Sequence, residues 1–269
     1  MLENINETVE FLRSRGISDP VAGIILGTGL GGLAANIRNR IEIDYREIPG
    51  FPVSTVEGHD GKLISGIFGG KKIVAMKGRF HYYEGYRPEQ VALPIRVMKY
   101  LGITRLFLSN AAGGVNPLFH IGDIMIITDH INLMTNPLIG LNDERIGPRF
   151  PDMSAAYDKE LIEKATEIAR KHNINVRKGV YLGTSGPTFE TPSEYKYFHI
   201  IGADSVGMST TPEVIVARHM GLKCFAVSII TDLGVEGKIE YMTHEMVQRE
   251  AEKAEARMTT IMTELLTSL

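Results

Sequence analysis

The chain has 269 residues, enough for one large domain with a substantial core, and its 43% hydrophobic and 23% charged content is ordinary for a globular protein. Its formal net charge of -3 gives no basic field, which argues against nucleic acid as the main partner. No segment approaches the roughly 18 consecutive apolar residues of a membrane span, and the first residues lack a signal-peptide pattern. We therefore expect a cytoplasmic protein without membrane association. The single cysteine, Cys224, lies in an apolar run and is expected to pack as a small buried hydrophobe.

Strand-like apolar runs alternate with helical patterns along the chain, and many of the runs end in glycine. This alternation predicts an α/β fold, a single domain over residues 1–269 with a mixed central β-sheet flanked by α-helices. Helices are expected at 3–15, from Pro88 to Leu101, at 158–171, 193–201 and 212–220, and from Thr243 onward. Strands are expected at 22–26, 41–45, 62–68, 72–76, 105–109, 124–128, 176–182, 204–206 and 224–230.

The first expected strand ends in a glycine-rich loop. Gly27, Gly29 and Gly32 match the G-x-G-x-x-G pattern of dinucleotide-binding loops. Only about nine residues separate Gly32 from the next strand, too few for the long helix that a dinucleotide fold requires. We favour a phosphate-sized loop with backbone N–H groups and the Thr28 hydroxyl as donors; a purely structural turn is the alternative.

Cationic and titratable side chains follow in two further loops. Arg79 and His81 lie two residues apart at the end of an apolar run, so in extended backbone they point to the same side. A guanidinium fork and an imidazole together suit a small oxyanion, although an ordinary turn would also explain the segment. His59 lies in a glycine-flanked loop, where a histidine can be functional or simply solvated.

Small and polar residues also follow the strands of the second half. An aromatic ring beside a carboxylate, as in Phe189 and Glu190, suits a flat nitrogen heterocycle, with a helix-entry loop as the alternative. Ser209 precedes a helix and can offer its hydroxyl to an anion, and Thr231 and Asp232 close another strand. Ligands of open α/β sheets bind at such strand ends. The residues therefore predict an enzyme that binds phosphate and a nitrogen heterocycle.

Six motifs occur in the order found in trimeric purine nucleoside phosphorylases, and the chain resembles that family over nearly its whole length. The resemblance implies a partly barrel-like sheet and a homotrimer. It implies phosphorolysis of purine (2′-deoxy)ribonucleosides to free base and (deoxy)ribose 1-phosphate, in purine salvage, with phosphate as co-substrate and no metal or organic cofactor. The motifs are residues 27–31, 55–59, 78–86, 110–114, 186–191 and 207–214, and residues 149–154 also fit.

The resemblance also implies a role for each matching position. His59, His81, Glu190 and Asp232 would be catalytic, and Phe150 would close the pocket of a neighbouring subunit. Phosphate would be held by Thr28, His59, Arg79, His81, the backbone of Ala111 and Ser209; ribose by Tyr83, Tyr181, Met208 and His244; and the base by Phe189, Glu190 and Asp232.

Two positions depart from the 6-oxopurine enzymes of that family. Thr28 replaces serine and keeps the hydroxyl, whereas Asp232 stands in place of asparagine, and an ionised aspartate can only accept hydrogen bonds. The related methylthioadenosine phosphorylases carry aspartate here and prefer 6-aminopurines. Glu190 and His244 resemble the 6-oxopurine type, so we expect adenosine to be accepted beside inosine and guanosine. A methylthioadenosine phosphorylase, a nucleoside hydrolase and a purine- or phosphate-binding sensor are the alternatives.

Overall fold

The computed structural model describes residues 2–28, 30–53 and 61–269, and within them it contains nine strands and seven α-helices. The strands are β1 (Ala22–Leu26), β2 (Arg38–Asp44), β3 (Lys62–Phe68), β4 (Lys71–Lys77), β5 (Arg105–Gly114), β6 (Ile124–Asn132), β7 (Val176–Gly183), β8 (Ser205–Gly207) and β9 (Lys223–Leu233). The helices are α1 (Leu2–Ser14), α2 (Pro88–Val91), α3 (Leu93–Leu101), α4 (Lys159–Lys171), α5 (Pro192–Ile200), α6 (Thr211–His219) and α7 (His244–Thr267).

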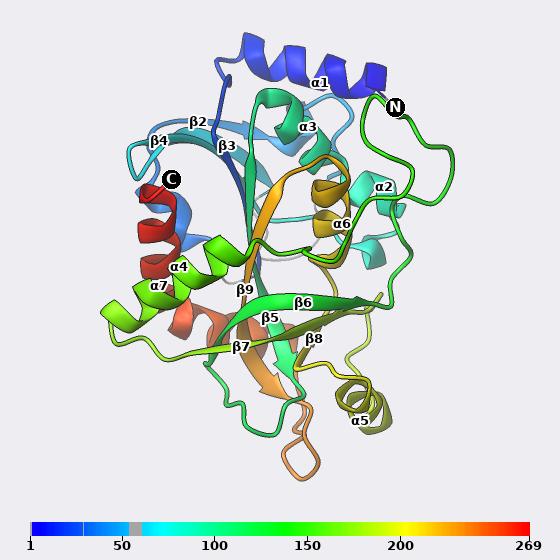
Figure 1. Ribbon diagram of the computed structural model, residues 1–269, viewed down its shortest axis with the longest axis vertical. Coiled ribbons are helices and arrows are strands. Elements are labelled where there is room, and N and C mark those ends of the chain that lie inside the picture. Colours follow the sequence, from blue (N-terminus) through cyan, green and yellow to red (C-terminus); the bar gives the residue numbers. More distant parts are fainter. Residues whose placement is uncertain (1, 29, 54–60) are drawn as a thin grey trace.

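The strands form one mixed sheet whose second half closes on itself (Figure 1). Their order is β2-β3-β4-β1-β5-β8-β7-β6-β9, and an additional parallel pairing of β5 with β9 joins the last five strands into a ring. The ring is mixed, because β8 runs antiparallel to β5 and β6 runs antiparallel to β9. The expected fold, a mixed and partly barrel-like sheet flanked by helices, is confirmed.

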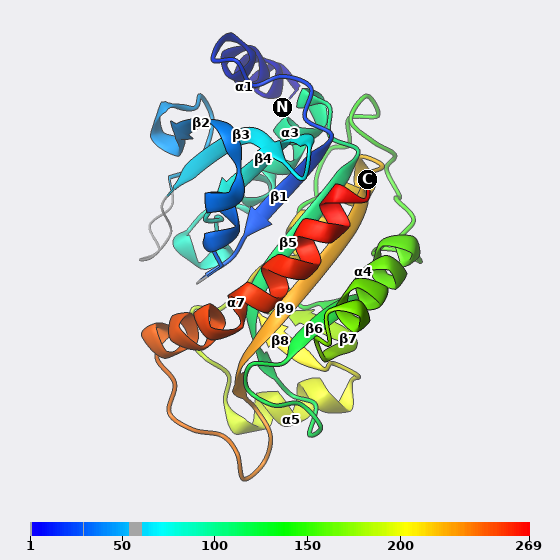
Figure 2. The ribbon, with the colours of Figure 1, turned by 90° about the vertical axis from the view of Figure 1, so that its left-hand side faces the viewer.

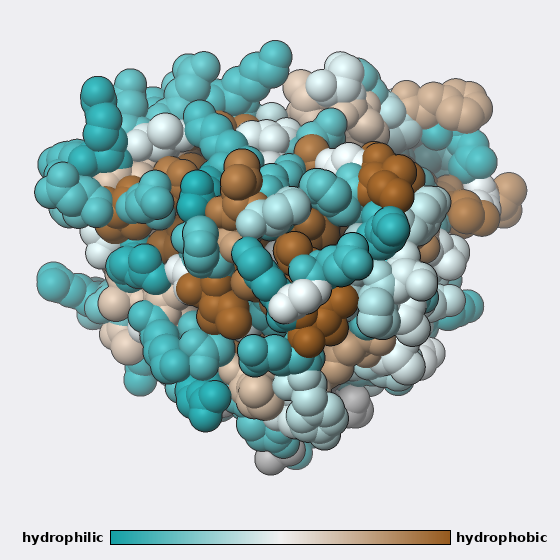
Figure 3. Space-filling model, turned by 90° about the horizontal axis from the view of Figure 1, so that it is seen from below, coloured by the Kyte–Doolittle hydropathy of each residue, from teal (hydrophilic) through white to brown (hydrophobic). Residues whose placement is uncertain are grey.

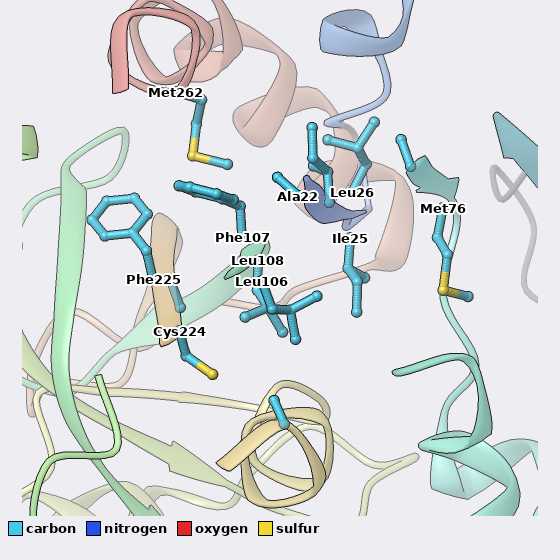
Figure 4. Close-up of a cluster of buried hydrophobic side chains, with 14 of the residues drawn as sticks. Ala22, Ile25, Leu26, Met76, Leu106, Phe107, Leu108, Cys224, Phe225 and Met262 are labelled. Atoms are coloured by element: carbon cyan, nitrogen blue, oxygen red, sulfur yellow. The ribbon is translucent and has the colours of Figure 1, made fainter. Parts of the chain in front are cut away.

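The main core lies where α7 covers β5 and β9. Figure 2 shows α7 lying along these two strands, with α4 beside it. Phe107 of β5 and Phe225 of β9 stand with their ring centroids 6.1 Å apart, and Met262 of α7 points toward them (Figure 4). Cys224 is fully buried in the same cluster, as expected from its apolar surroundings, and burial raises the pKa of its thiol to about 12.

Most of the expected elements differ from the observed ones by one or more residues at an end, and two of the differences have a clear structural reason. The helix expected from Pro88 to Leu101 is broken at Ala92 into α2 and α3. Pro94 explains the break, because its ring lacks an N–H and would clash with the carbonyl of residue 90 in a continuous helix. The strand expected to end at Ser109 continues to Gly114, because Gly113 and Gly114 pair with both β8 and β9.

Among the described residues, no helix is long and apolar enough to cross a membrane. The lower face of the molecule in Figure 1 is mainly hydrophilic, with exposed apolar side chains in separate groups (Figure 3). In the loop between β6 and α4, Ile139, Leu141 and Phe150 are 76%, 101% and 88% exposed.

Candidate active site

One cavity of about 440 Å³ brings together residues that lie far apart in the sequence. It opens where β5, β8 and β9 end and where the loops after β1 and β4 begin. This is the place at which α/β sheets bind ligands, because strand ends and the loops that follow them converge there. Eleven of the residues predicted for the site line it: Thr28, Arg79, His81, Tyr83, Ala111, Phe189, Glu190, Met208, Ser209, Asp232 and His244.

Arg79 forms a fixed cationic wall of this cavity. Its side chain is 2% exposed, and its Nε donates to Glu213 Oε1 at 2.9 Å while its Nη1 donates to the Ser109 carbonyl at 2.8 Å. Glu213 lies in the first turn of α6 and is equally buried. These two bonds fix the plane of the guanidinium, so the donors that face the cavity are oriented before any anion binds.

His81 lies beside Arg79 and is held by its own short helical turn. Its ring stacks on Tyr83, with centroids 4.7 Å apart and planes 13° from parallel. The His81 backbone N–H donates to Glu84 Oε1 at 2.7 Å, and Nδ1 lies 3.3 Å from the same oxygen. Burial lowers the pKa of His81, and a proton on Nδ1 of the neutral ring would face the Glu84 carboxylate.

A network of hydroxyl groups borders the same cavity at Ser209. Ser209 Oγ lies 3.1 Å from Thr210 Oγ1, which accepts from Asn110 Nδ2 at 2.8 Å. Thr210 has a φ of +67°, a strained left-handed value for a β-branched residue. The strained backbone turns the chain into α6 directly after Ser209, whose backbone N–H donates to the Tyr181 hydroxyl at 3.3 Å.

Two carboxyl groups lie at the other end of the cavity, beside the ring of Phe189. Asp232 Oδ1 accepts from Thr231 Oγ1 at 2.9 Å, and Glu190 Oε1 accepts more weakly from Thr184 Oγ1 at 3.4 Å. Burial raises the pKa of both Glu190 and Asp232, and the Asp232 charge raises the pKa of Glu190 further. This end of the cavity therefore offers carboxyl oxygens beside a flat apolar surface.

Two of the described residues that were predicted for the site do not line the cavity. Tyr181 is fully buried behind Ser209, so it supports the wall of the cavity instead of forming it. Phe150 is 88% exposed on a separate depression that also contains Arg149. His59 lies outside the described residues.

Two side chains that lie beside the predicted site residues were not predicted from the sequence. Glu213 was visible in the motif at 207–214 but received no role, because its pairing with Arg79 spans 134 positions of the sequence. Tyr195 received no mention, although its side chain is only 5% exposed and borders the same depression as Glu190 and Asp232. Among the described residues, no group of three or more His, Cys, Asp or Glu side chains could hold a metal ion.

Comparison with known proteins agrees with this geometry. The family model described as the phosphorylase superfamily matches residues 21–267. The chain therefore belongs to the phosphorylase superfamily.

Two similar relatives are named as purine nucleoside phosphorylases. It is 49% identical over 257 residues to purine nucleoside phosphorylase 1 of Bacillus subtilis, covering 95% of both chains. It is 48% identical over 263 residues to purine nucleoside phosphorylase of Rattus norvegicus, covering 95% of this chain and 91% of the relative. The crystal structure of Schistosoma mansoni purine nucleoside phosphorylase in complex with adenosine superposes with a TM-score of 0.94 at 41% identity, covering 99% and 97% of the two chains. A Schistosoma purine nucleoside phosphorylase in complex with hypoxanthine superposes with a TM-score of 0.93.

Proposed function

We propose that this chain is a purine nucleoside phosphorylase, which cleaves purine (2′-deoxy)ribonucleosides with inorganic phosphate in purine salvage. The observation that carries the proposal is a single cavity with oriented anion donors at one end and a ring-and-carboxyl surface at the other. The relatives in Bacillus subtilis and Rattus norvegicus bear this name, and the Schistosoma structures hold adenosine and hypoxanthine. The proposed products are the free purine and (deoxy)ribose 1-phosphate.

The proposed reaction follows from the positions of the anion donors and of the ring-and-carboxyl surface in the cavity. A phosphate held by Thr28, Arg79, His81, the Ala111 backbone and Ser209 would form the new bond to the anomeric carbon as the bond to purine N9 breaks. Positive charge develops on the ribosyl carbon in the transition state, and an adjacent, preoriented anion stabilises it. Because Arg79 is fixed by two hydrogen bonds, this orientation is established before the substrate binds.

The sugar and the base occupy the rest of the cavity in this proposal. Tyr83, Met208 and His244 surround the ribose, with His244 at the 5′-hydroxyl, and Tyr181 supports Ser209 from behind. Phe189 contacts the face of the purine. Glu190, when ionised, accepts from N1–H and from a 2-amino group, which favours hypoxanthine and guanine. Negative charge that develops on the leaving purine calls for a donor near N7 or O6, and Asp232 lies at that end.

The enzyme would act as a cytoplasmic homotrimer without a metal or organic cofactor and without a nucleic-acid partner. The loop that carries Ile139, Leu141 and Phe150 exposes apolar side chains that a second copy would cover. In this assembly Phe150 of one copy would close the cavity of its neighbour, and His59 would stand beside the phosphate.

The test is phosphate-dependent release of free base from inosine, guanosine, adenosine and 5′-methylthioadenosine in parallel. We expect release from inosine and guanosine that requires phosphate, with adenosine also cleaved. Turnover without phosphate would indicate a hydrolase, and binding without turnover would indicate a sensor. Activity confined to 5′-methylthioadenosine would indicate a methylthioadenosine phosphorylase. Among the proposed site residues, Asp232 is the one that favours this alternative.

A further inference from the structure

The glycine-rich loop between β1 and the short 3-10 helix η1 (Gly32–Asn36) borders two hollows of the molecule. Thr28 lines the candidate active-site cavity, whereas Gly27, Gly31 and Gly32 line a second hollow of about 730 Å³. Four of the six residues from 27 to 32 are glycines, whose backbone has the greatest conformational freedom. The Thr28 hydroxyl therefore has a fixed position only if contacts from outside the loop restrain this backbone.

The start of the loop is fixed by the sheet. The Gly27 backbone N–H donates to Ser109 Oγ of β5 at 3.4 Å, and an added Cβ at Gly27 would come within 2.6 Å of the Ser109 carbonyl oxygen. The Leu30 N–H donates to the Gly27 carbonyl at 3.1 Å and closes the turn that contains Thr28. The Leu30 side chain is fully buried, so this turn is tied to the core on one side.

The end of the loop is held by Glu255 of α7. The Gly32 backbone N–H donates to Glu255 Oε1 at 2.5 Å, although the two residues are 223 positions apart in the sequence. The carboxylate lies directly against Gly32, because an added Cβ there would come within 2.5 Å of Oε2. Ala251, Ala254 and Met258 of the same helix are fully buried, so Glu255 extends from a helix that the core holds in place.

We propose that Glu255 is a positioning residue that fixes the glycine-rich loop, so that the Thr28 hydroxyl is oriented toward phosphate before phosphate binds. The inference rests on the proposed function and adds to it a residue that lines the second hollow and not the cavity. The negative charge of Glu255 by itself disfavours a nearby phosphate, because like charges repel. The hydrogen bond to Gly32 and the charge therefore act on phosphate binding in opposite directions, and substitutions can separate them.

The first test compares Glu255→Ala with Glu255→Gln. Alanine removes the acceptor of the Gly32 N–H and should raise both the Kd and the KM for inorganic phosphate about tenfold, the effect of one hydrogen bond to a charged group. The KM for inosine should change little. Glutamine removes the charge but keeps an acceptor oxygen, so it should leave the phosphate Kd unchanged or lower it. Isothermal titration calorimetry with inorganic phosphate measures the Kd, and steady-state kinetics measure the two KM values.

Glu252→Ala is the matched control. Glu252 is exposed on the same helix and lines the same second hollow, so its removal deletes the same charge from the same surface. This substitution leaves the bond between Gly32 and Glu255 in place, and the phosphate Kd should not rise.

Gly32→Ala tests the other partner of the bond. Gly32 has no positive φ, so its backbone accepts alanine, but the new Cβ would displace the Glu255 carboxylate. Alone, this variant should raise the phosphate Kd; added to Glu255→Ala, it should cause little further loss, because the bond is already absent. Additive losses in the double variant would show that the two residues act independently.

An unchanged phosphate Kd in Glu255→Ala would overturn the proposal, as would equal losses in Glu255→Ala and Glu255→Gln. Equal increases in the KM values for phosphate and inosine would reveal a purely structural role. Failure of the proposed function has a different signature, the absence of phosphate-dependent base release from the unsubstituted protein. Calorimetry with phosphate needs no turnover, so it tests the role of Glu255 in that case too.

Discussion

Under the proposed function, Asp232 is the residue that we expect to control the choice of base most directly. An asparagine at this position carries a permanent N–H donor and needs no proton to serve N7 or O6 of a 6-oxopurine. We expect Asp232→Asn to shift the ratio of kcat/KM toward inosine over adenosine by about tenfold, the effect of one hydrogen bond to a charged group. Steady-state kinetics with both nucleosides measure this ratio. Asp19→Asn is the matched control, because Asp19 is exposed and has a φ of +50° that asparagine tolerates; equal ratios in all three proteins would contradict the role of Asp232.

The same substitution predicts a pH-dependent change in stability. Burial raises the pKa of Asp232 in the folded protein, so the folded state favours the protonated carboxyl. The stability that this group contributes is thus present at low pH and is lost as the pH rises through the raised pKa. Asparagine does not titrate, so Asp232→Asn should raise Tm at pH 8 by roughly 2–4 °C and change it little at pH 4. Thermal unfolding at both pH values checks this, and a Tm difference of the same size at pH 4 and pH 8 would refute it.

At the scale of elements, the ion pair between Arg79 and Glu213 connects the segment after β4 to the first turn of α6. Both side chains are nearly inaccessible, with an Nε–Oε1 distance of 2.9 Å. Loss of one partner of a buried pair typically costs about 3–5 kcal/mol, and we expect that loss in the free energy of unfolding of Glu213→Ala. Urea denaturation measures it. Glu160→Ala removes a glutamate from the first turn of α4, where the side chain is 62% exposed, and should cost less than about 1 kcal/mol; similar losses in the two variants would contradict the argument.

The elements themselves were largely predictable because each carries its own local pattern. The strands 22–26 and 62–68 were predicted with the bounds that are observed, since apolar runs flanked by glycine or lysine define them within a few residues. The helix from Pro88 was predicted too long. Its apolar spacing continues past Ala92 and does not reveal the break that Pro94 imposes.

The candidate site residues that follow strands could be predicted from the sequence. The side chains that contact these residues could not. Phe189, Glu190 and Asp232 stand in recognisable motifs, and all three line the cavity. The partners that orient them do not share a local pattern with them. Tyr195 lies in the middle of α5, where its spacing is that of any buried helical residue, and only the fold brings it beside Glu190 and Asp232.

At the scale of the whole molecule, the exposed side chain of Phe150 tests the proposed assembly. If a second copy inserts this ring into its neighbour's cavity, Phe150→Ala should raise the KM for inosine about tenfold with less effect on the KM for phosphate, because a buried aromatic ring is lost only at the nucleoside end. Analytical ultracentrifugation of the unsubstituted protein should give about three times the 29.8 kDa chain mass. Leu141→Ala, another fully exposed side chain of the same loop, separates the effect of the ring from a general loss of apolar surface. A monomeric protein with unaltered kinetics in Phe150→Ala would exclude the assembly.

The closure of the sheet by β9 has a consequence for how the protein is made. During synthesis on the ribosome, β5 and β6 emerge long before residues 223–233, the strand that pairs with both of them. Until then each presents an open edge, the kind of surface that invites pairing with another chain. Thr231 and Asp232 arrive with that same strand, and His244 still later. A nascent chain therefore gains its protected sheet and the Asp232 carboxyl of the candidate site in one late event, so prematurely terminated products should be both inactive and prone to aggregate.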